Sequence, residues 1–420
     1  MPRALLLLLV LAAPLARGDE CPADRAPVET HEARLHRDLL CDYSPDFRPV
    51  RDHTTPVTVK VRFALKYISF DSQEETFTIH SWVALSWTDQ FLGWEPAQYG
   101  GIAETQFESH EIWTPRLALF NADASKFNMD SFYVTCLATS AGAVTCVPAL
   151  AHHAVCRAAL RRWPYDRQNC TLFFGSWMHT GEQVNFTFYR NQPVVLDEAQ
   201  DGPGWRLLTV AHRRLPGNYN NATYPMLKYT FVLQRESAGP AALVVAPAAA
   251  VALLTLLGPL LDARRPARLG LACFTLLAHF TFLSEIGYNL PKHSADTPVL
   301  LLFARDSMVL SLCGVAAALA GAALRGRGGA GRGGGAAPGW LRAAVRLTAR
   351  SPARYVVFTE WAAPGDDHKP LEADLTAADA AAAAADDDWA QFADLFNSFV
   401  FFTTLLVYII LLCWYIPYSD

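Results

Sequence analysis

Charged residues are scarce in this sequence. They make up 18% of its 420 residues, whereas ordinary soluble domains carry about a quarter. The formal net charge is −5, so no clustered basic face is indicated and no nucleic-acid partner is expected. A glycine-rich phosphate loop, an HExxH motif and a CxxC pair are also missing. Without a nucleophile–base or metal-ligand constellation, we expect no enzyme, no cofactor and no bound metal.

Hydrophobic residues, by contrast, make up 52% of the chain and aromatic residues 12%. This composition excludes disorder throughout and indicates a membrane protein with a large folded part. The first eighteen residues are typical of a secretory signal, with Arg3, an apolar stretch at 4–11 and a cleavage site at Ala16-Arg17-Gly18. The apolar stretch is too short to span a bilayer, so we expect the following residues to enter an oxidising compartment.

Residues 19–238 contain no apolar run of membrane-spanning length. The segment 57–63 alternates as VTVKVRF, and segments 76–82 and 227–233 also suit strands. Many short strands separated by turn residues predict a β-sandwich. Leu35, Leu39 and Leu40 recur at helical spacing and predict an amphipathic helix near the start.

Four apolar stretches follow, at 239–261, 269–290, 298–324 and 395–417. Each is long enough to cross a membrane as a helix, which predicts a four-helix transmembrane bundle in a lipid bilayer. Arginines cluster between the first two stretches (Arg264, Arg265, Arg268) and after the third, which places these links in the cytosol. Both termini are then extracellular. Within the third stretch, Arg305 and Asp306 should face protein, water or each other.

These boundaries divide the chain into five parts. Residues 1–18 are the signal peptide, 19–238 an extracellular β-sandwich, 239–324 three transmembrane helices, 325–394 a partly disordered cytoplasmic loop, and 395–420 a fourth transmembrane helix with a short extracellular tail. Within the loop, 326–339 is a glycine-rich linker. The alanine-rich, acidic segment 371–389 is compatible with a helix that leads into the last span.

Nine cysteines are present, and three of them (Cys273, Cys313 and Cys413) lie in the spans. The other six precede the first span: Cys21, Cys41, Cys136, Cys146, Cys156 and Cys170. Six thiols in an oxidising compartment can pair fully. Cys156 and Cys170 enclose thirteen residues, Cys136 and Cys146 flank an apparent hairpin turn, and Cys21 and Cys41 remain. The connectivity of Cys21, Cys41, Cys136 and Cys146 stays open at this stage.

Three N-x-Ser/Thr sequons, at Asn169, Asn185 and Asn221, predict glycosylation of the same region. The residues between Cys156 and Cys170 end in Trp163-Pro164-Tyr165-Asp166-Arg167-Gln168-Asn169. This loop resembles the signature of the Cys-loop pentameric ligand-gated ion channels. Ser86-Trp87-Thr88-Asp89, Ile112-Trp113-Thr114-Pro115 and Gly175-Ser176-Trp177 resemble the nicotinic acetylcholine receptor branch, non-alpha type. The likeness covers nearly the whole chain except the glycine-rich insert.

This resemblance implies a Cys156–Cys170 disulfide and a neurotransmitter site between neighbouring subunits. Aromatic rings bind cationic transmitters through cation–π contacts, each of about 0.5–2 kcal/mol. By likeness, Trp82 is the complementary-face tryptophan, Trp177 the principal-face tryptophan, and Tyr224 a late-loop tyrosine. Phe120 stands where a tyrosine is usual, and Tyr219 is a further contributor.

Other aromatic residues have a simpler interpretation. We expect Trp87, Trp94 and Trp113 to pack in the core, as buried aromatics usually do. Two departures from the family pattern affect the principal face. The adjacent cysteine pair of acetylcholine-binding alpha subunits is missing before Tyr224, and Arg116 occupies a position where an aspartate is usual.

On the second span, helical steps select a pore-facing stripe of Gly270, Phe274, Leu277, Thr281, Ser284 and Tyr288. The family register makes Leu277 the gating leucine, which closes a pore by dewetting. Five copies of Phe274 would crowd the lumen, which favours a hetero-pentamer of homologous subunits. The ectodomain likeness favours cation conduction, whereas Pro266-Ala267-Arg268 resembles anion-conducting glycine and GABA receptors. A non-conducting accessory subunit is a further alternative.

The resemblance also implies how binding is coupled to the pore. Arg235 aligns with a family arginine at the junction with the membrane, and Asp71 and Asp166 are its candidate partners. Pro164 lies in the same loop as Asp166, and Ser72 stands where an acidic residue is common. The implied protein is a multi-pass receptor of the plasma membrane, at synapses, which binds a small cationic neurotransmitter.

Overall fold

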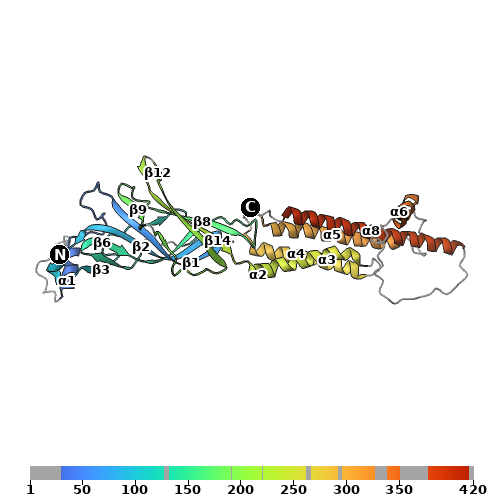
Figure 1. Cartoon of the computed structure of the whole chain (residues 1–420), viewed down its shortest axis with the longest axis horizontal. Helices are drawn as coiled ribbons and strands as arrows, with labels where there is room; N and C mark the ends of the chain where they lie inside the picture. Colours follow the sequence, from blue (N-terminus) through green and yellow to red (C-terminus); the bar gives the residue numbers. More distant parts are fainter. Residues whose placement is uncertain are drawn as a thin grey trace, which may run out of the picture.

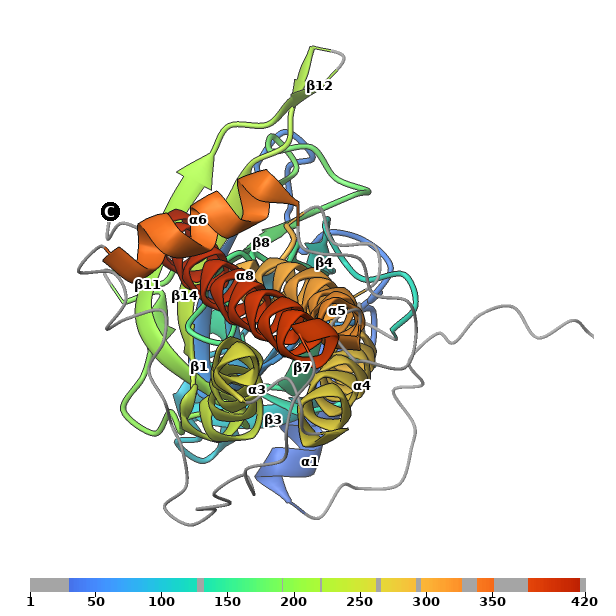
Figure 2. The same cartoon turned by 90° about the vertical axis from the view of Figure 1, so that its right-hand side faces the viewer.

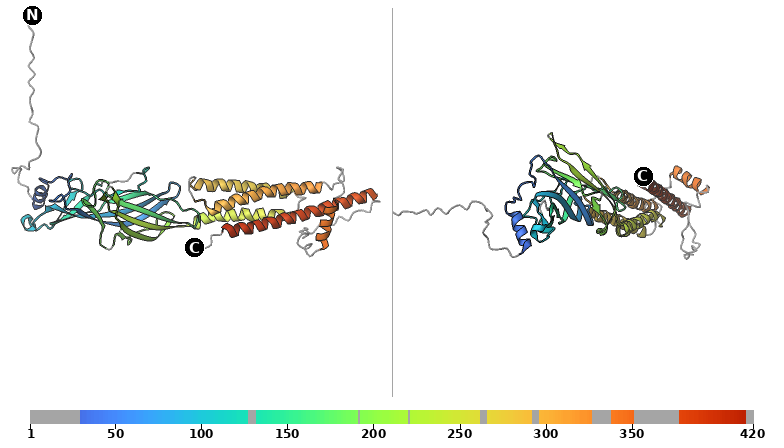
Figure 3. Two further views of the ribbon diagram at one scale, coloured as in Figure 1. Left: turned by 90° about the horizontal axis from the view of Figure 1, so that it is seen from above. Right: turned by 60° about the vertical axis from the view of Figure 1, so that its left-hand side comes forward.

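The computed structural model of the protein describes residues 30–126, 132–190, 192–219, 221–261, 266–291, 296–326, 338–350 and 377–415. The expected signal peptide, Cys21, Arg264, Arg265, most of the glycine-rich linker and the carboxyl-terminal tail lie outside these ranges. The described chain is elongated, with β-sheets at one end and long helices at the other (Figures 1 and 3). This is the predicted fold class, a β-sandwich followed by a four-helix bundle.

Two large sheets build the β-rich part. The first has strand order β10-β1-β2-β6-β5-β3, with β7 also on β2 and β9 also on β1. Its strands are β1 (Val57–Asp71), β2 (Thr76–Gly93), β3 (Glu104–Glu108), β5 (Thr135–Thr139), β6 (Ala141–Cys146), β7 (Ala149–Val155), β9 (Val184–Phe188) and β10 (Val194–Val195). The second sheet has the order β11-β14-β8-β4. Its strands are β4 (Ala118–Leu119), β8 (Arg167–Gly175), β11 (Trp205–Leu215) and β14 (Met226–Arg235).

Aromatic side chains fill the space between the two sheets. Phe63 of β1 lies 5.0 Å from Phe174 of β8 and 4.9 Å from Tyr229 of β14, measured between ring centroids. Phe77 of β2 similarly meets Phe231 of β14 at 5.4 Å. The predicted strands 57–63, 76–82 and 227–233 are confirmed as parts of the longer strands β1, β2 and β14. Alternation identified them because one face of each strand is buried in this core.

The predicted amino-terminal helix is α1 (His31–Leu40). Thr30 caps it, since its Oγ1 accepts a hydrogen bond from Ala33 N at 3.2 Å. Leu35 is fully buried, and Leu39 and Leu40 pack against the sandwich core. The helical spacing of these leucines therefore reflects the face that the helix buries.

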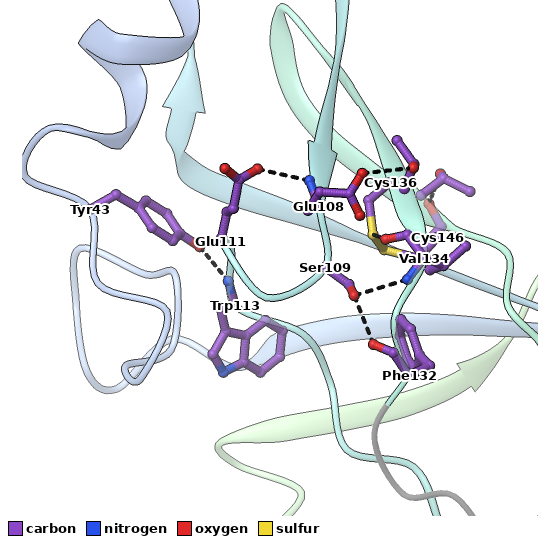
Figure 4. Close-up of a disulfide and its surroundings, with 12 residues drawn as sticks. Tyr43, Glu108, Ser109, Glu111, Trp113, Phe132, Val134, Cys136 and Cys146 are labelled. Atoms are coloured by element: carbon purple, nitrogen blue, oxygen red, sulfur yellow. Dashed lines mark hydrogen bonds between the residues drawn. A yellow bond between two sulfur atoms is a disulfide. The ribbon is translucent and has the colours of Figure 1, made fainter.

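Two disulfides between described cysteines cross-link the sandwich. Cys136 and Cys146 are opposite each other on β5 and β6, and Cys156 is bonded to Cys170 of β8. Cys41 also belongs to a disulfide, and its expected partner Cys21 is outside the described residues. Around Cys136–Cys146, Ser109 holds the incoming chain by donating to Phe132 O and accepting from Val134 N (Figure 4).

The tryptophans assigned to the core lie there. Trp87 and Trp113 are buried, with ring centroids 5.9 Å apart, and Trp94 Nε1 donates to Ile102 O at 2.7 Å. Tyr43 supports the same region, since its hydroxyl accepts a hydrogen bond from Trp113 N (Figure 4). The same hydroxyl donates to Asp89 Oδ2. Burial raises the pKa of both the Tyr43 phenol and the Asp89 carboxyl.

Four helices are long and apolar enough to cross a membrane, in the parts of the chain that are described. The first is helical from Ala238 to Leu260 and comprises α2 (Ala238–Pro240), a π-helical turn (Ala241–Val245), α3 (Ala246–Leu257) and a 3₁₀ turn (Gly258–Leu260). The others are α4 (Pro266–Asn289), α5 (Val299–Gly326) and α8 (Ala377–Tyr415). Seen along the bundle, they lie side by side, with the short α6 (Gly339–Arg350) against α8 (Figure 2).

Polar side chains connect these helices inside the bundle. His279 of α4 meets Ser307 Oγ of α5 at 2.8 Å, and Ser307 Oγ meets the Tyr408 hydroxyl of α8 at 2.6 Å. Arg268 at the start of α4 is buried and donates to Asn397 Oδ1 of α8 at 2.6 Å. Such bonds have no water to compete with in a bilayer, so they fix how the helices face one another.

Arg305 and Asp306 contact each other, as one of the sequence alternatives proposed. Arg305 Nη2 lies 2.7 Å from Asp306 Oδ1, and the Tyr415 hydroxyl donates to Asp306 Oδ2 at 2.7 Å. Because Tyr415 is the last residue of α8, this contact ties the end of α8 to the beginning of α5.

Candidate functional site

The principal-face candidates Phe120 and Trp177 lie together at the second sheet. Phe120 follows β4, Trp177 follows β8, and their ring centroids are 4.6 Å apart at an angle of 85°. Trp177 remains 67% exposed, so its face is open to a ligand. Gly175 permits the arrangement, because a side chain there would collide with the Phe120 ring.

A projecting hairpin carries the two candidate tyrosines. It is formed by β12 (Asn218–Tyr219) and β13 (Ala222–Thr223) and extends away from the sheets (Figures 1 and 2). Thr223 anchors its base by donating to Glu182 Oε1 at 2.6 Å, in the loop that follows Trp177. Tyr219 is 71% exposed on the hairpin, and Tyr224 is half-buried at its base. Among the described residues, no pair of stacked or edge-on rings joins either tyrosine to Trp177 or Phe120.

Trp82, the complementary-face candidate, lies on the other sheet. It belongs to β2, opposite Ala64 of β1 and Ala149 of β7, and its side chain is 40% exposed. The structure therefore separates Trp82 from Phe120 and Trp177 within one chain. A box made from all three would require two neighbouring chains.

Positively charged side chains lie near the principal-face candidates Phe120 and Trp177. Arg116 is exposed on the segment that leads to Phe120. Burial, together with the charges of Arg48 and Arg116, lowers the pKa of His179, which lies two residues beyond Trp177. A cationic ligand would meet this positive potential at the principal face.

At the opposite end of the sandwich, the structure pairs Arg235 with Asp166. Arg235 Nε lies 2.7 Å from Asp166 Oδ1, and Nη2 lies 3.1 Å from Oδ2. Ser72 Oγ accepts a weaker bond from the same guanidinium, at 3.5 Å. Asp71, the other candidate partner, instead accepts from Gln73 N at 2.8 Å and closes its own turn. Asp71 is therefore not the partner of Arg235, because its carboxylate serves the β1–β2 turn.

Further groups that sequence reasoning missed hold this ion pair in place. Gln168 Nε2 donates to Asp166 Oδ2 at 2.6 Å, and the Trp205 ring lies 4.3 Å from the Arg235 guanidinium. Trp205 is itself fixed, since its Nε1 donates to Phe70 O at 3.0 Å. The Asp166 carboxylate is only 1% exposed, so the pair depends on these contacts.

The two loops beside this ion pair touch the helices directly. Gln73 Nε2, in the β1–β2 turn, donates to Tyr288 O at the end of α4 at 3.1 Å. Val299 N, at the start of α5, donates to Arg161 O in the Cys156–Cys170 loop at 3.1 Å. That loop contains a cis peptide before Pro164, which is buried. Gln73 and Arg161 carried no sequence signal, because both contacts join residues far apart in the chain.

The candidate pore stripe lies on the open face of α4. All six of its residues are exposed in the isolated chain: Gly270, Phe274, Leu277, Thr281, Ser284 and Tyr288. The residues that α4 buries, including Thr275, His279 and Ile286, lie on its other face. Phe280 and Glu285, which sequence reasoning did not assign, are also exposed on this helix. The helical period alone separates these two faces.

The three sequons differ in how their side chains are placed. Asn169 on β8 and Asn221 in the hairpin turn are exposed. Asn185 on β9 is half-buried, and its Oδ1 accepts from Arg214 Nη2 at 2.7 Å. Asn169 and Asn221 are thus the better placed for attachment of a sugar.

Comparison with known proteins identifies the β-rich part. Residues 32–237 match the family described as the neurotransmitter-gated ion-channel ligand binding domain. The neuronal acetylcholine receptor subunit beta-3 of Rattus norvegicus is 29% identical over 298 residues, 69% of this chain and 63% of the relative. The neuronal subunit non-alpha-2 of Carassius auratus is 28% identical over 287 residues, 67% of this chain and 61% of the relative.

The human neuronal subunit alpha-10 is 30% identical over 263 residues, 61% of this chain and 58% of that protein. The chain thus spans about three fifths of the length of these three relatives. The matched residues include the disulfide-closed loop and the sheets described above, and four helices of membrane-spanning length follow them. Residues 32–237 therefore belong to the family of neurotransmitter-gated ion channels, and the chain is a divergent relative of nicotinic acetylcholine receptor subunits.

Proposed function

We propose that the chain is a subunit of a plasma-membrane receptor in which an extracellular neurotransmitter opens a transmembrane pore. Residues 19–238 form the extracellular ligand-binding domain, and 239–324 with 395–420 form the membrane domain. Residues 325–394 form the cytoplasmic loop, and both termini are extracellular. The transmitter is a small cation, and it binds between this chain and a homologous subunit in a synaptic hetero-pentamer.

The exposed stripe of α4 is the observation that best supports a pore. In one isolated chain, α4 buries polar groups such as Thr275 and His279 among its neighbours, yet leaves Phe274 and Leu277 more than half exposed. A helix of a soluble protein would bury such large apolar side chains, so this face of α4 requires a cover from outside the single chain. With five homologous subunits around an axis, this face of α4 lines a shared lumen, where Leu277 and the corresponding residues of the other subunits close the pore by dewetting.

Cation conduction is the selectivity we propose. Glu285 is exposed next to Ser284, near the end of α4 that adjoins the sheets. A ring of such carboxylates concentrates cations. Arg268, whose motif resembles anion channels, is 4% exposed and bonded to Asn397, so its charge is directed into the bundle. The sequence Pro266-Ala267-Arg268 keeps anion conduction as the second candidate.

Current recordings in ion-substituted solutions test the proposal. The chain is co-expressed with an acetylcholine-binding alpha-type subunit. Leu277 and Ile286 of α4 are replaced by cysteine, one at a time, in a chain that also carries Cys273→Ser. Leu277→Cys should become accessible to a charged thiol reagent during agonist application, whereas the buried Ile286→Cys should not. A reversal potential that follows sodium supports cation conduction, and one that follows chloride supports the alternative. Surface assembly without any change in current would instead identify an accessory subunit.

A further inference from the structure

The ring of Trp82 already has a cation over it. Lys66 Nζ lies 4.1 Å from the centroid of the indole ring, within the range of a cation–π contact. Among the described residues, no carboxylate forms an ion pair with Lys66. The ring is therefore the electrostatic partner that the structure gives to this ammonium group.

A break in the register of β1 places Lys66 on this ring. The pairing of β1 with β2 shifts between Leu65 and Tyr67, so Lys66 is the extra residue of a β-bulge. Regular alternation would put consecutive side chains on opposite faces, yet both Lys66 and Tyr67 are exposed. Tyr67 stacks on His80 at 4.1 Å, and Lys66 covers Trp82, two residues further along β2.

The backbone holds the bulge in this form. The carbonyl of Lys66 accepts a hydrogen bond from Gln200 N at 2.7 Å, which gives the extra residue a partner outside the strand pair. A residue in a bulge is normally left unpaired, and bulges often redirect a side chain. The position of Lys66 over Trp82 is therefore built into the backbone, and does not depend on the rotamer of a long surface side chain alone.

From this geometry we infer that Lys66 is a specificity-determining residue that competes with cationic ligands for the Trp82 ring and so weakens their binding at this face of the chain. The inference rests on the proposed function, in which that face contributes to a transmitter site. A quaternary ammonium group binds the ring in the place that the Lys66 ammonium holds, so the ligand must displace it. Given the strength of a cation–π contact, displacement weakens ligand binding about 2- to 30-fold.

Lys66→Gln removes the competing charge and keeps a side chain of similar reach. Lys60→Gln is the matched control, because Lys60 is also exposed, lies on the same strand, and contacts no aromatic ring among the described residues. The full chain is co-expressed with an acetylcholine-binding alpha-type subunit, and currents are measured with acetylcholine and with tetramethylammonium. Lys66→Gln should lower the half-maximal concentration of both probes about 2- to 30-fold, and Lys60→Gln should leave it unchanged. An unchanged or higher value for Lys66→Gln overturns the inference.

A chemical measurement on the purified full-length chain separates this inference from the proposed function. Mass spectrometry follows acetylation of each lysine by an amine-reactive ester. Lys66 should react more slowly than Lys60, and Trp82→Leu or added tetramethylammonium should abolish the difference. Equal reactivity of the two lysines in the wild-type chain overturns the inference whether or not currents are obtained. Absence of current from every combination, with Lys66 still protected, counts against the proposed function alone.

Discussion

Replacing Arg235 by glutamine tests the junction between the sandwich and the helices. In the structure, the Asp166 carboxylate is 1% exposed and receives two bonds from Arg235, whose side chain is 14% exposed. Removing one partner of a buried ion pair typically costs about 3–5 kcal/mol, because the remaining charge is left without compensation. Gln168 retains its bond to Asp166, so we expect a loss near the lower end, about 3 kcal/mol.

We expect the open channel to depend on this ion pair, and a loss of this size that falls on the open state alone shifts the equilibrium between closed and open channels roughly 100-fold. Receptors that contain Arg235→Gln should therefore keep agonist affinity close to the wild-type value but give almost no current. Surface biotinylation, radioligand binding and the concentration–response curve of the same cells separate these quantities. Because the unpaired Asp166 carboxylate destabilises the fold, Arg235→Gln should also reduce the amount of receptor at the cell surface. The double variant Arg235→Gln/Asp166→Asn removes that charge and should restore the surface amount.

Arg206→Gln is the matched control. Arg206 follows Trp205 on β11 and pairs with Glu236 at 2.8 Å, but both side chains are about half exposed. Exposed pairs contribute about 0–1 kcal/mol, so this variant should conduct like the wild type. A wild-type concentration–response curve for Arg235→Gln, or an equal loss of current in Arg206→Gln, would refute the role assigned to the buried pair.

Three further predictions concern a buried histidine in the core, the Cys136–Cys146 disulfide and the proposed pore. Burial lowers the pKa of His152 from 6.5 to about 4, so the folded state binds fewer protons than the unfolded state between these values. The free energy of unfolding should then fall by about 3 kcal/mol as the pH drops from 6.5 to 4, and His152→Phe should flatten this dependence in thermal unfolding followed by circular dichroism. Replacing Cys136 and Cys146 together by serine should destabilise the sandwich by about 3 kcal/mol, measured by thermal unfolding of the purified chain; an unchanged midpoint would contradict this. Expressed alone, the chain should give no ligand-gated current, because five Phe274 rings crowd the pore; a robust current in oocytes that express only this chain would show that the crowding argument is wrong.

Much of the architecture is predictable because it depends on local periodicity. The alternation of 57–63 reports which face of β1 is buried in the core, and the lengths of the apolar stretches match four helices that are long enough to cross a membrane. Span boundaries differ by a few residues, and α8 extends from Ala377 straight into the last span, as the alanine-rich pattern allowed.

The candidate site was less predictable because its contacts depend on long-range register. Sequence likeness offered Asp71 and Asp166 equally as partners of Arg235, and only the folded chain distinguishes the turn residue from the ion-pair residue. Lys66 gave no signal, since its place over Trp82 follows from a shift in strand pairing. Pro266-Ala267-Arg268 resembled anion-conducting receptors, but the sequence did not reveal that Arg268 is bonded to Asn397 of α8 inside the bundle.

The hydroxyl and imidazole contacts among the spanning helices have a practical consequence for purification. Within hydrocarbon these few bonds link α8 to α4, from Tyr408 through Ser307 of α5 to His279. A solubilising agent that lets water reach them weakens each bond and leaves α8 held mainly by its apolar packing on α5. Solubilisation in a harsh detergent should therefore release α8 first. Mild detergents or lipid nanodiscs, which keep water out of the bundle, should preserve the native packing of all four helices.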